Sequence, residues 1–303
     1  MEAPRPRRRL DDPSLAPSSK DALSSDVPSS DVPAGPAWPP EKPWPQAGKV
    51  GDGPPPDDIM IEFRDLYKSF GDKHILKGAT MAIPKGVSTV IMGGSGTGKS
   101  VTIKHVVGLL TADKGEVWVQ GQNVGELGKD DLDKLRLKIG YLFQSGALFD
   151  SMTVYEQMEF VLARHTDLDA AGRKDRIMET LDWVNLPETT DQYPSELSGG
   201  QRKRIGLARS IILQPDIMVY DEPTTGLDPI SVRVVSELIN RLRDERGITS
   251  ITITHDLLCA EMISDHVFFL LDGVYAAEGT LAEVAASDVP EISDFFGGEV
   301  VAS

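Results

Sequence analysis

One glycine-rich segment constrains this chain more than any other feature. Residues Gly93–Ser100 fit the pattern G-x-x-x-x-G-K-[ST]. They follow a nearly continuous apolar run, Val87–Met92, which is typical of a buried parallel strand, and they precede residues with helical spacing. In this order, a loop directs successive backbone N–H groups and the start of a helix at one anion. We therefore predict a phosphate-binding loop, because the flanking strand and helix disfavour a chance match.

Lys99 and Ser100 have separate expected roles in this loop. Lys99 would reach the β- and γ-phosphates of a nucleoside triphosphate, and the Ser100 hydroxyl would complete a Mg²⁺ shell. The expected ligands are thus ATP and Mg²⁺. The other residues expected to contact them from this segment are Gly93, Gly94, Ser95, Gly96, Thr97, Gly98 and Thr102.

Two carboxylates end a second apolar run, Ile217–Tyr220. Ligands of open α/β sheets gather beyond the carboxyl ends of the strands, so we expect this pair near the loop. Asp221 would hold Mg²⁺, directly or through water, and Glu222 would act as the general base on the attacking water. By themselves, two acidic residues at the end of a strand are more often surface residues of a turn. The presence of the phosphate loop makes a catalytic pair the favoured interpretation.

Two further polar residues follow strand-like runs. Gln144 comes after Ile139–Phe143 and would ligate Mg²⁺ or water, whereas His255 comes after Ser250–Thr254 and would contact the γ-phosphate and the water. Taken singly, each is more often a structural or surface residue. The prediction that they belong to the site depends on the other motifs.

Strand-like and helix-like segments alternate from Ile59 onward, which predicts an α/β fold with a largely parallel sheet. Residues 153–212 are mainly helical in pattern. We expect one domain over 59–298, a helical subdomain at about 145–212, and a short tail at 299–303.

Residues 1–58 are predicted to be a disordered Pro/Ser-rich leader. They hold 14 of the 21 prolines and a direct repeat, Ser24–Pro28 followed by Ser29–Pro33. Such a composition buries too little apolar surface to offset the entropy of ordering. A solvated leader is favoured over a docking peptide around Trp38 and Trp44.

Charge and cysteine content exclude several classes of protein. The formal net charge of −16 argues against affinity for nucleic-acid phosphate. The single cysteine, Cys259, indicates a reducing cytosol. No apolar run reaches the ~18 residues of a membrane-spanning helix, so a role at a membrane would need a partner.

Residues Leu197–Gln201, with the sequence Leu-Ser-Gly-Gly-Gln, form a motif that distinguishes one family among the many phosphate-loop ATPases. It resembles the signature of ATP-binding-cassette (ABC) proteins, and the resemblance covers about Ile59 to Gly298. It implies an ABC-type nucleotide-binding domain, with a mainly parallel sheet core, an antiparallel β portion and a helical signature subdomain. By this resemblance Gln144 is the Q-loop glutamine, His255 the switch histidine, Asp228 part of the D-loop, and Phe70 the aromatic that stacks on adenine.

The same resemblance implies a homodimer. In the family two subunits pack head to tail, and the signature of one caps the γ-phosphate held by the other. In this chain those capping residues would be Ser198, Gly199, Gly200 and Gln201. ATP would then join the subunits, and hydrolysis would weaken the contact and drive a partner's conformational change.

Residues 142–156 closely resemble the Q-loop region of Mla/Mce-type lipid-transport ATPases, although that subfamily commonly has Met where this chain has Gln201. The resemblance implies an ATPase that is peripheral at the cytoplasmic face of the inner membrane. It would drive a permease that docks near Gly146–Met152 and works with a Mce-domain lipid-binding protein. The alternatives are an ABC importer for a polar solute such as an amino acid, and a soluble ABC ATPase acting on nucleic acid or ribosomes.

The C-terminal run Pro290–Phe296 also resembles the tail of these ATPases, which contacts the partner subunit. Its paired phenylalanines equally suit a cap on the chain's own core.

Overall fold

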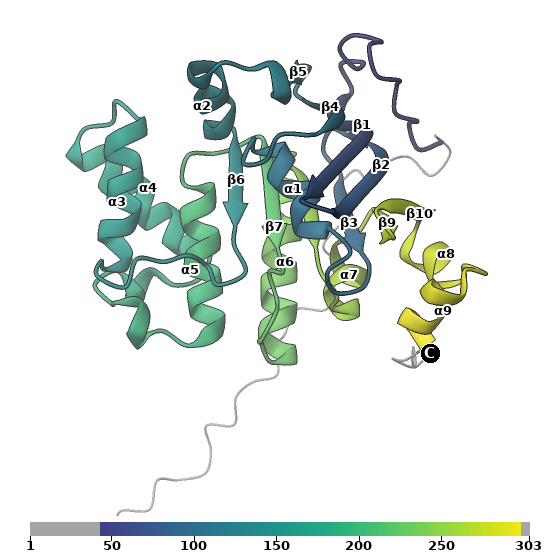
Figure 1. Ribbon diagram of the computed structural model, residues 1–303. Helices are drawn as coiled ribbons and strands as arrows, with labels where there is room; N and C mark the ends of the chain where they lie inside the picture. The colour runs from purple at the N-terminus through teal and green to yellow at the C-terminus, as the bar shows by residue number, and fades with distance from the viewer. Residues whose placement is uncertain (1–42, 298–303) are drawn as a thin grey trace, which may run out of the picture. The chain divides into compact units, whose positions relative to one another are not determined.

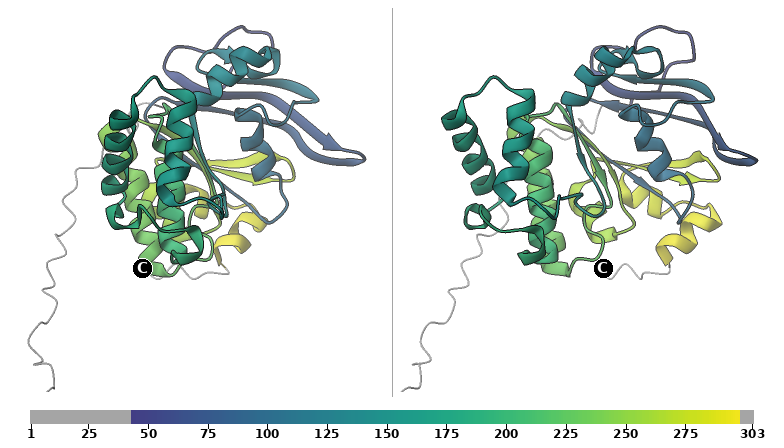
Figure 2. Two further views of the ribbon diagram at one scale, coloured as in Figure 1. Left: turned by 90° about the vertical axis from the view of Figure 1, so that its left-hand side faces the viewer. Right: turned by 60° about the vertical axis from the view of Figure 1, so that its left-hand side comes forward.

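Two β-sheets form the framework of residues 43–297, which are the residues that the computed structural model describes. Six strands lie in the order β10-β9-β3-β8-β7-β6, and four lie in the order β2-β1-β4-β5 (Figure 1, Figure 2). The strands are β1 (Ile59–Phe70), β2 (Lys73–Pro84), β3 (Ser88–Met92), β4 (Lys114–Val119), β5 (Gln122–Asn123), β6 (Ile139–Leu142), β7 (Ile217–Asp221), β8 (Thr249–Ile253), β9 (His266–Leu271) and β10 (Val274–Gly279).

The six-stranded sheet brings the predicted motifs to one edge. β6, β7, β8, β3 and β9 pair in parallel with their neighbours, and β10 pairs antiparallel with β9. Because parallel strands end at the same edge, the loops after β3, β6, β7 and β8 open on one side. The four-stranded sheet is antiparallel in its pairings. The predicted α/β fold, with a mainly parallel core and an antiparallel portion, is confirmed.

Nine α-helices and three short 3₁₀ helices complete the described part of the chain. They are α1 (Lys99–Val106), α2 (Lys129–Leu137), α3 (Val154–His165), α4 (Ala170–Trp183), α5 (Gly199–Ile211), α6 (Pro229–Arg246), α7 (Leu257–Ile263), α8 (Leu281–Ala285), α9 (Pro290–Gly297), η2 (Val124–Glu126), η3 (Pro187–Thr189) and η4 (Pro194–Glu196). α3, α4 and α5 pack on one another, and α5 also contacts β6 and α6 (Figure 1). Within residues 43–297, none of these helices combines the length and apolar character needed to cross a membrane.

The six-stranded sheet separates two hydrophobic clusters. Alternate side chains of β7 point to opposite faces, as the pleat of a strand requires. Ile217 and Val219 join the cluster shared with the four-stranded sheet, whereas Met218 and Tyr220 join the cluster shared with α3–α6. Both faces of β7 are therefore covered, which explains its unbroken apolar sequence.

The C-terminal helix α9 caps this second cluster. Phe296 is buried, and its ring centroid lies 6.2 Å from that of Phe269 on β9. Phe295 packs edge-on against the same ring at 5.2 Å. Of the two expected roles for this tail, the contacts within this chain are those of a cap on its own core.

Residues 43–58 differ from the disordered leader that composition predicted. The Trp44 indole donates a 2.8 Å hydrogen bond to the Ala82 carbonyl and stacks on His266 with ring centroids 3.8 Å apart. Farther along, the Gly48 amide binds the Glu62 carboxylate, and the Gly53 carbonyl accepts from Arg64. The segment has no core of its own, so composition suggested disorder, but the neighbouring sheets supply the missing contacts. Residues 1–42, including Trp38, lie outside the described residues.

Candidate active site

A cleft of about 790 Å³ lies at the carboxyl ends of the parallel strands. It brings together residues predicted from five separate motifs. The predicted residues that line it are Phe70, Gly93, Gly94, Ser95, Gly96, Gly98, Lys99, Ser100, Gln144, Asp221, Glu222 and His255. Residues that sequence reasoning did not place there are Lys73, Ile75, Val101, Ile253 and Phe295.

The phosphate loop needs its glycines because neighbouring atoms leave no room for a side chain. Gly93 has φ of +141°, and a Cβ there would lie 2.3 Å from the Leu270 carbonyl oxygen. Gly98 has φ of +113°, and its Cβ would lie 2.8 Å from Ile75. Both conformations are disfavoured for residues with a side chain. The loop can thus curl tightly between β3 and the start of α1.

The Lys99 side chain lies against the backbone of the phosphate loop. Its Nζ donates to the carbonyls of Gly93 and Gly94 at 2.7 and 2.8 Å. Burial lowers the pKa of Lys99, while the carboxylates of Glu222 and Asp221 act in the opposite direction. The ammonium is therefore positioned between the loop and the acidic end of β7, where it faces the cleft.

Two residues of the predicted loop set do not line the cleft. The Thr97 hydroxyl donates to the Gly94 carbonyl at 3.0 Å, and the buried Thr102 hydroxyl donates to the Gly98 carbonyl at 3.2 Å. These bonds close the loop on itself and onto α1. Both threonines therefore stabilise the conformation of the phosphate loop without lining the cleft.

Asp221 is held from two sides. Its Oδ1 accepts a 3.3 Å hydrogen bond from the Ser100 hydroxyl, and its Oδ2 accepts a 3.2 Å bond from the Tyr141 hydroxyl. Burial, with a smaller contribution from Asp221, raises the pKa of Tyr141, so the phenol remains a donor. Sequence reasoning missed Tyr141, although it lies in the strand directly before Gln144.

The donor set at Ser100 and Asp221 fits Mg²⁺. A hydroxyl and a carboxylate are hard oxygen ligands, and this ion commonly takes one or two protein ligands with phosphate oxygens and water. Among residues 43–297 no group of three or more His, Cys, Asp or Glu side chains is arranged to hold a metal. A divalent ion in this cleft would therefore depend on the nucleotide's own oxygens as well.

Glu222 adopts a left-handed backbone conformation, with φ of +54°. Its Oε2 lies 2.8 Å from His255 Nδ1 and accepts a 3.0 Å bond from the Thr225 hydroxyl. The backbone N–H of Glu222 still binds the Ile253 carbonyl of β8 at 2.9 Å. The carboxylate thus has a defined direction at the end of β7, and Thr225 is a second residue that sequence reasoning missed.

Cations on α5 hold the segment that follows β6. The Lys203 Nζ binds the carbonyls of Gln144 and Glu222, and burial lowers the pKa of Lys203 to about 8. The Arg209 guanidinium binds the Gly146 carbonyl at 3.3 Å and lies 5.7 Å from the Phe149 ring centroid. Neither cation belongs to a motif that the sequence analysis used.

The signature residues and Asp228 are absent from the lining of this chain's cleft. Ser198 caps α5, because its Oγ accepts from the Gln201 amide and its own amide donates to the Gln201 side chain. Methionine in place of Gln201 has no oxygen to accept that bond. Asp228 caps α6 in the same way, through the amides of Ile230 and Ser231.

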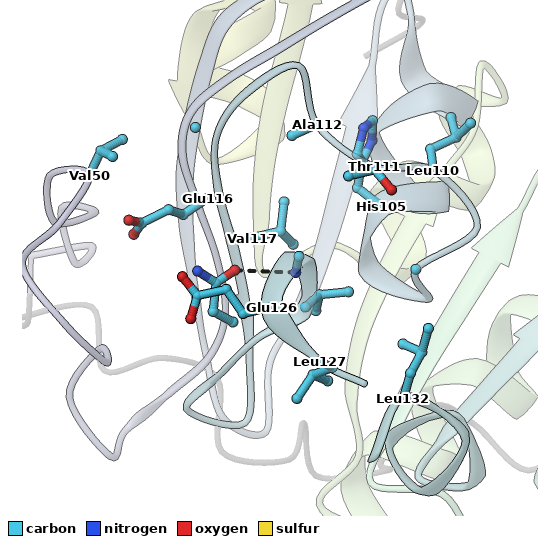
Figure 3. Close-up of a pocket in the computed structure, with 15 residues that line it drawn as sticks. Val50, His105, Leu110, Thr111, Ala112, Glu116, Val117, Glu126, Leu127 and Leu132 are labelled. Carbon is cyan, nitrogen blue, oxygen red and sulfur yellow. Dashed lines mark hydrogen bonds between the residues drawn. The ribbon is translucent and has the colours of Figure 1, made fainter. Parts of the chain in front are cut away.

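A second cavity, of about 430 Å³, lies beside β4, η2 and the end of α1 (Figure 3). Residues lining it include His105, Glu116 and Leu132. In its lining, the Gly125 amide donates a 3.2 Å hydrogen bond to the Asn123 side chain. The predicted catalytic and nucleotide-binding residues do not line this cavity, so we place the chemistry in the cleft.

Comparisons with known proteins agree with this arrangement. Residues 76–225 match the family described as ABC transporter. The chloroplastic protein trigalactosyldiacylglycerol 3 of Arabidopsis thaliana is 38% identical over a 260-residue alignment that covers 80% of this chain and 75% of that protein. The chain belongs to the ABC transporter family. Its cassette is an ATP-binding and ATP-hydrolysing domain, as the motifs predicted.

Two other relatives of this ABC cassette carry names that differ in substrate. MlaF of Escherichia coli, the intermembrane phospholipid transport system ATP-binding protein, is 34% identical over 79% of this chain and 89% of that protein. A protein of Mycobacterium leprae named as the probable ribonucleotide transport ATP-binding protein mkl is 37% identical over 82% of this chain and 72% of that protein.

Solved structures show the same cassette fold. CbiO1 of Clostridium perfringens, part of the ABC transporter complex CbiONQ, aligns with a TM-score of 0.70 and 31% identity over 76% of this chain and 92% of its own. A dimeric post-hydrolysis cassette bound to ADP and Pi aligns with a TM-score of 0.68 and 30% identity, over 73% of this chain and 99% of its own. A cassette of this fold has therefore been found as a dimer that binds an adenine nucleotide.

Proposed function

We propose that this chain is the ATP-hydrolysing subunit that powers a membrane lipid transporter of Mla/Mce type. The observation that carries the proposal is the similarity to MlaF over 89% of that protein's length, because MlaF is named for phospholipid transport. The Arabidopsis relative is named for a galactolipid. The mycobacterial name favours a second candidate, transport of a polar solute such as a ribonucleotide.

The cleft supports a division of roles in ATP hydrolysis. The loop amides and Lys99 bind the phosphates, while Phe70, which is 48% exposed, offers a face for adenine. Ser100, Asp221 and Gln144 would hold Mg²⁺, which would supply neutralising charge at the phosphates. Glu222 accepts the proton of the attacking water, and His255 orients that carboxylate through the 2.8 Å contact.

A head-to-tail homodimer would complete this site. The signature residues cap α5 outside the chain's own cleft, and a loop placed there is free to meet the phosphates bound by another copy. The dimeric solved cassette supports the pairing of two copies. Asp228 and the 77% exposed Ile230, which begin α6, would lie at the same junction.

The permease would dock on the segment Gly146–Met152 at the cytoplasmic face of the inner membrane. Phe149 in this segment is 51% exposed, and its backbone amide is bound by Gln157 of α3. An apolar side chain held outward on a fixed loop suits a short partner helix. A Mce-domain protein would then contact the lipid, while this subunit stays peripheral.

Purification from solubilised membranes tests the transported substrate. We expect a tagged full chain to retain a permease together with a Mce-domain protein, and its ATP hydrolysis in that complex to rise when phospholipid is supplied. The chain with Phe149→Asp should lose the permease but keep nucleotide binding, which serves as the matched control. Recovery of a soluble solute-binding protein, with hydrolysis stimulated by a polar solute, would replace lipid transport with the second candidate.

A further inference from the structure

Lys203 is a buried cation beside the cleft. It lies on α5, five residues after Ser198, and is 6% exposed. Its ammonium donates to the backbone carbonyl of Gln144 and, at 2.9 Å, to that of Glu222. One side chain of the signature helix therefore connects the loop after β6 to the acidic end of β7.

The carbonyl of Glu222 needs this donor because of the backbone conformation there. At φ of +54°, the chain turns out of the extended path of β7, which is strained for a residue with a side chain. The N–H of Glu222 stays bound to the Ile253 carbonyl, but the Glu222 carbonyl binds Lys203. A partly buried carbonyl that lost this donor would favour a different conformation.

The turn at Glu222 decides where its carboxylate points. In the observed geometry Oε2 reaches both His255 and Thr225. Glu222 would leave these partners if its backbone returned to the strand conformation. Gln144 is tied to the same ammonium, so its backbone and that of Glu222 are held at a common point.

We propose that Lys203 is a positioning residue for ATP hydrolysis, holding the Glu222 carboxylate and the Q-loop in one geometry. It does not touch the reacting atoms. The inference rests on the proposed role of Glu222 as the residue that activates water. The helix α5 begins at the signature. Through Lys203 it is therefore hydrogen-bonded to both the loop after β6 and the end of β7.

The test compares steady-state hydrolysis by the full chain and its variants. We expect Lys203→Gln to lower kcat at least tenfold and to change KM for ATP by less than threefold. Lys203→Arg keeps the charge and several donors, so we expect it to recover at least threefold over the Gln variant. The matched control is Arg204→Gln on the same helix, which loses bonds to the carbonyls of Val184 and Asn185 and should keep kcat within twofold.

Nucleotide binding provides a second measurement, which distinguishes a positioning role from a loss of fold. We expect Lys203→Gln and Lys203→Arg to bind ATP within threefold of the wild-type chain, because the phosphate loop and the bonds of Lys99 are unchanged. A chain that had lost its fold would lose this binding together with kcat.

The outcomes separate this inference from the assignment on which it rests. If Glu222→Gln hydrolyses ATP at the wild-type rate, the role of Glu222 is wrong and the inference falls with it. If Glu222→Gln is inactive while Lys203→Gln keeps kcat within twofold, only the Lys203 inference is wrong. Loss of ATP binding in both Lys203→Gln and Lys203→Arg would overturn it as well.

Discussion

Single side chains at the end of β7 depend on neighbours from other strands and helices. Asp221 is bound by Ser100 of α1 and Tyr141 of β6, and Glu222 is held by His255 and Thr225. The motif residues could be predicted because their spacing is local. Tyr141 could not, since it becomes a partner of Asp221 only when β6 and β7 are aligned. Thr225 lies only three residues after Glu222, but its bond depends on the left-handed turn at Glu222, which the spacing does not reveal.

Removal of the Tyr141 hydroxyl should weaken the metal site. Tyr141→Phe leaves Asp221 Oδ2 without this donor, and loss of a partner that orients a metal ligand typically costs about 10–100-fold in metal affinity or activity. We expect the Mg²⁺ concentration for half-maximal ATP hydrolysis to rise at least fivefold. Tyr193→Phe, at a 44% exposed side chain outside the cleft lining, is the control. Equal Mg²⁺ dependence in both variants would contradict this role.

At the scale of elements, helix α5 joins three parts of the cassette. Its N-terminus carries the signature, Lys203 meets the loops after β6 and β7, and Arg209 binds the segment proposed for permease docking. Gly206 allows the close packing, since a Cβ there would lie 3.2 Å from the Gly146 Cα. The helical periodicity of this region was visible in the sequence, but the identity of its partner loop was not.

Residues 43–58 act as an added element, and their removal should be measurable. Deletion of residues 1–58 takes away the Trp44 stack and the bonds to Arg64, whereas deletion of residues 1–42 keeps both. Loss of the Trp44 contacts alone is worth about 2 kcal/mol, on the order of 4 °C in the melting temperature. We expect the longer deletion to melt at least about 3 °C below the shorter one in a thermal unfolding scan.

Trp44→Ala in the full chain separates the side chain from the length of the deletion. The variant should show most of the same decrease in melting temperature. Equal melting temperatures for the two truncated chains would mean that the contacts of residues 43–58 add no net stability.

The whole molecule is expected to work as a pair of copies. With ATP and Mg²⁺, Glu222→Gln should elute as a dimer in size-exclusion chromatography, because the nucleotide joins the subunits and is not hydrolysed. The double variant Glu222→Gln/Gly199→Arg should elute as a monomer. Its affinity for ATP in its own cleft should stay within threefold of that of Glu222→Gln. Gly199 is exposed, and its replacement leaves the bonds by which Ser198 caps α5 intact. The substitution therefore tests the contact between the two copies. A dimer that survives Gly199→Arg would contradict the head-to-tail arrangement.

Four features could be predicted from the amino-acid sequence alone: the phosphate loop, the strand-end carboxylates, the signature and the α/β class. Those features are local patterns of glycines, apolar runs and charged residues, and their spacing already carries the chemistry. The three-dimensional structure was needed to show which side chains hold Asp221 and Glu222, that Lys203 connects two loops, and that residues 43–58 contact the neighbouring sheets. Apart from the bond from Thr225, these are contacts between segments far apart in the chain, which only the folded arrangement of the strands and of α5 brings together.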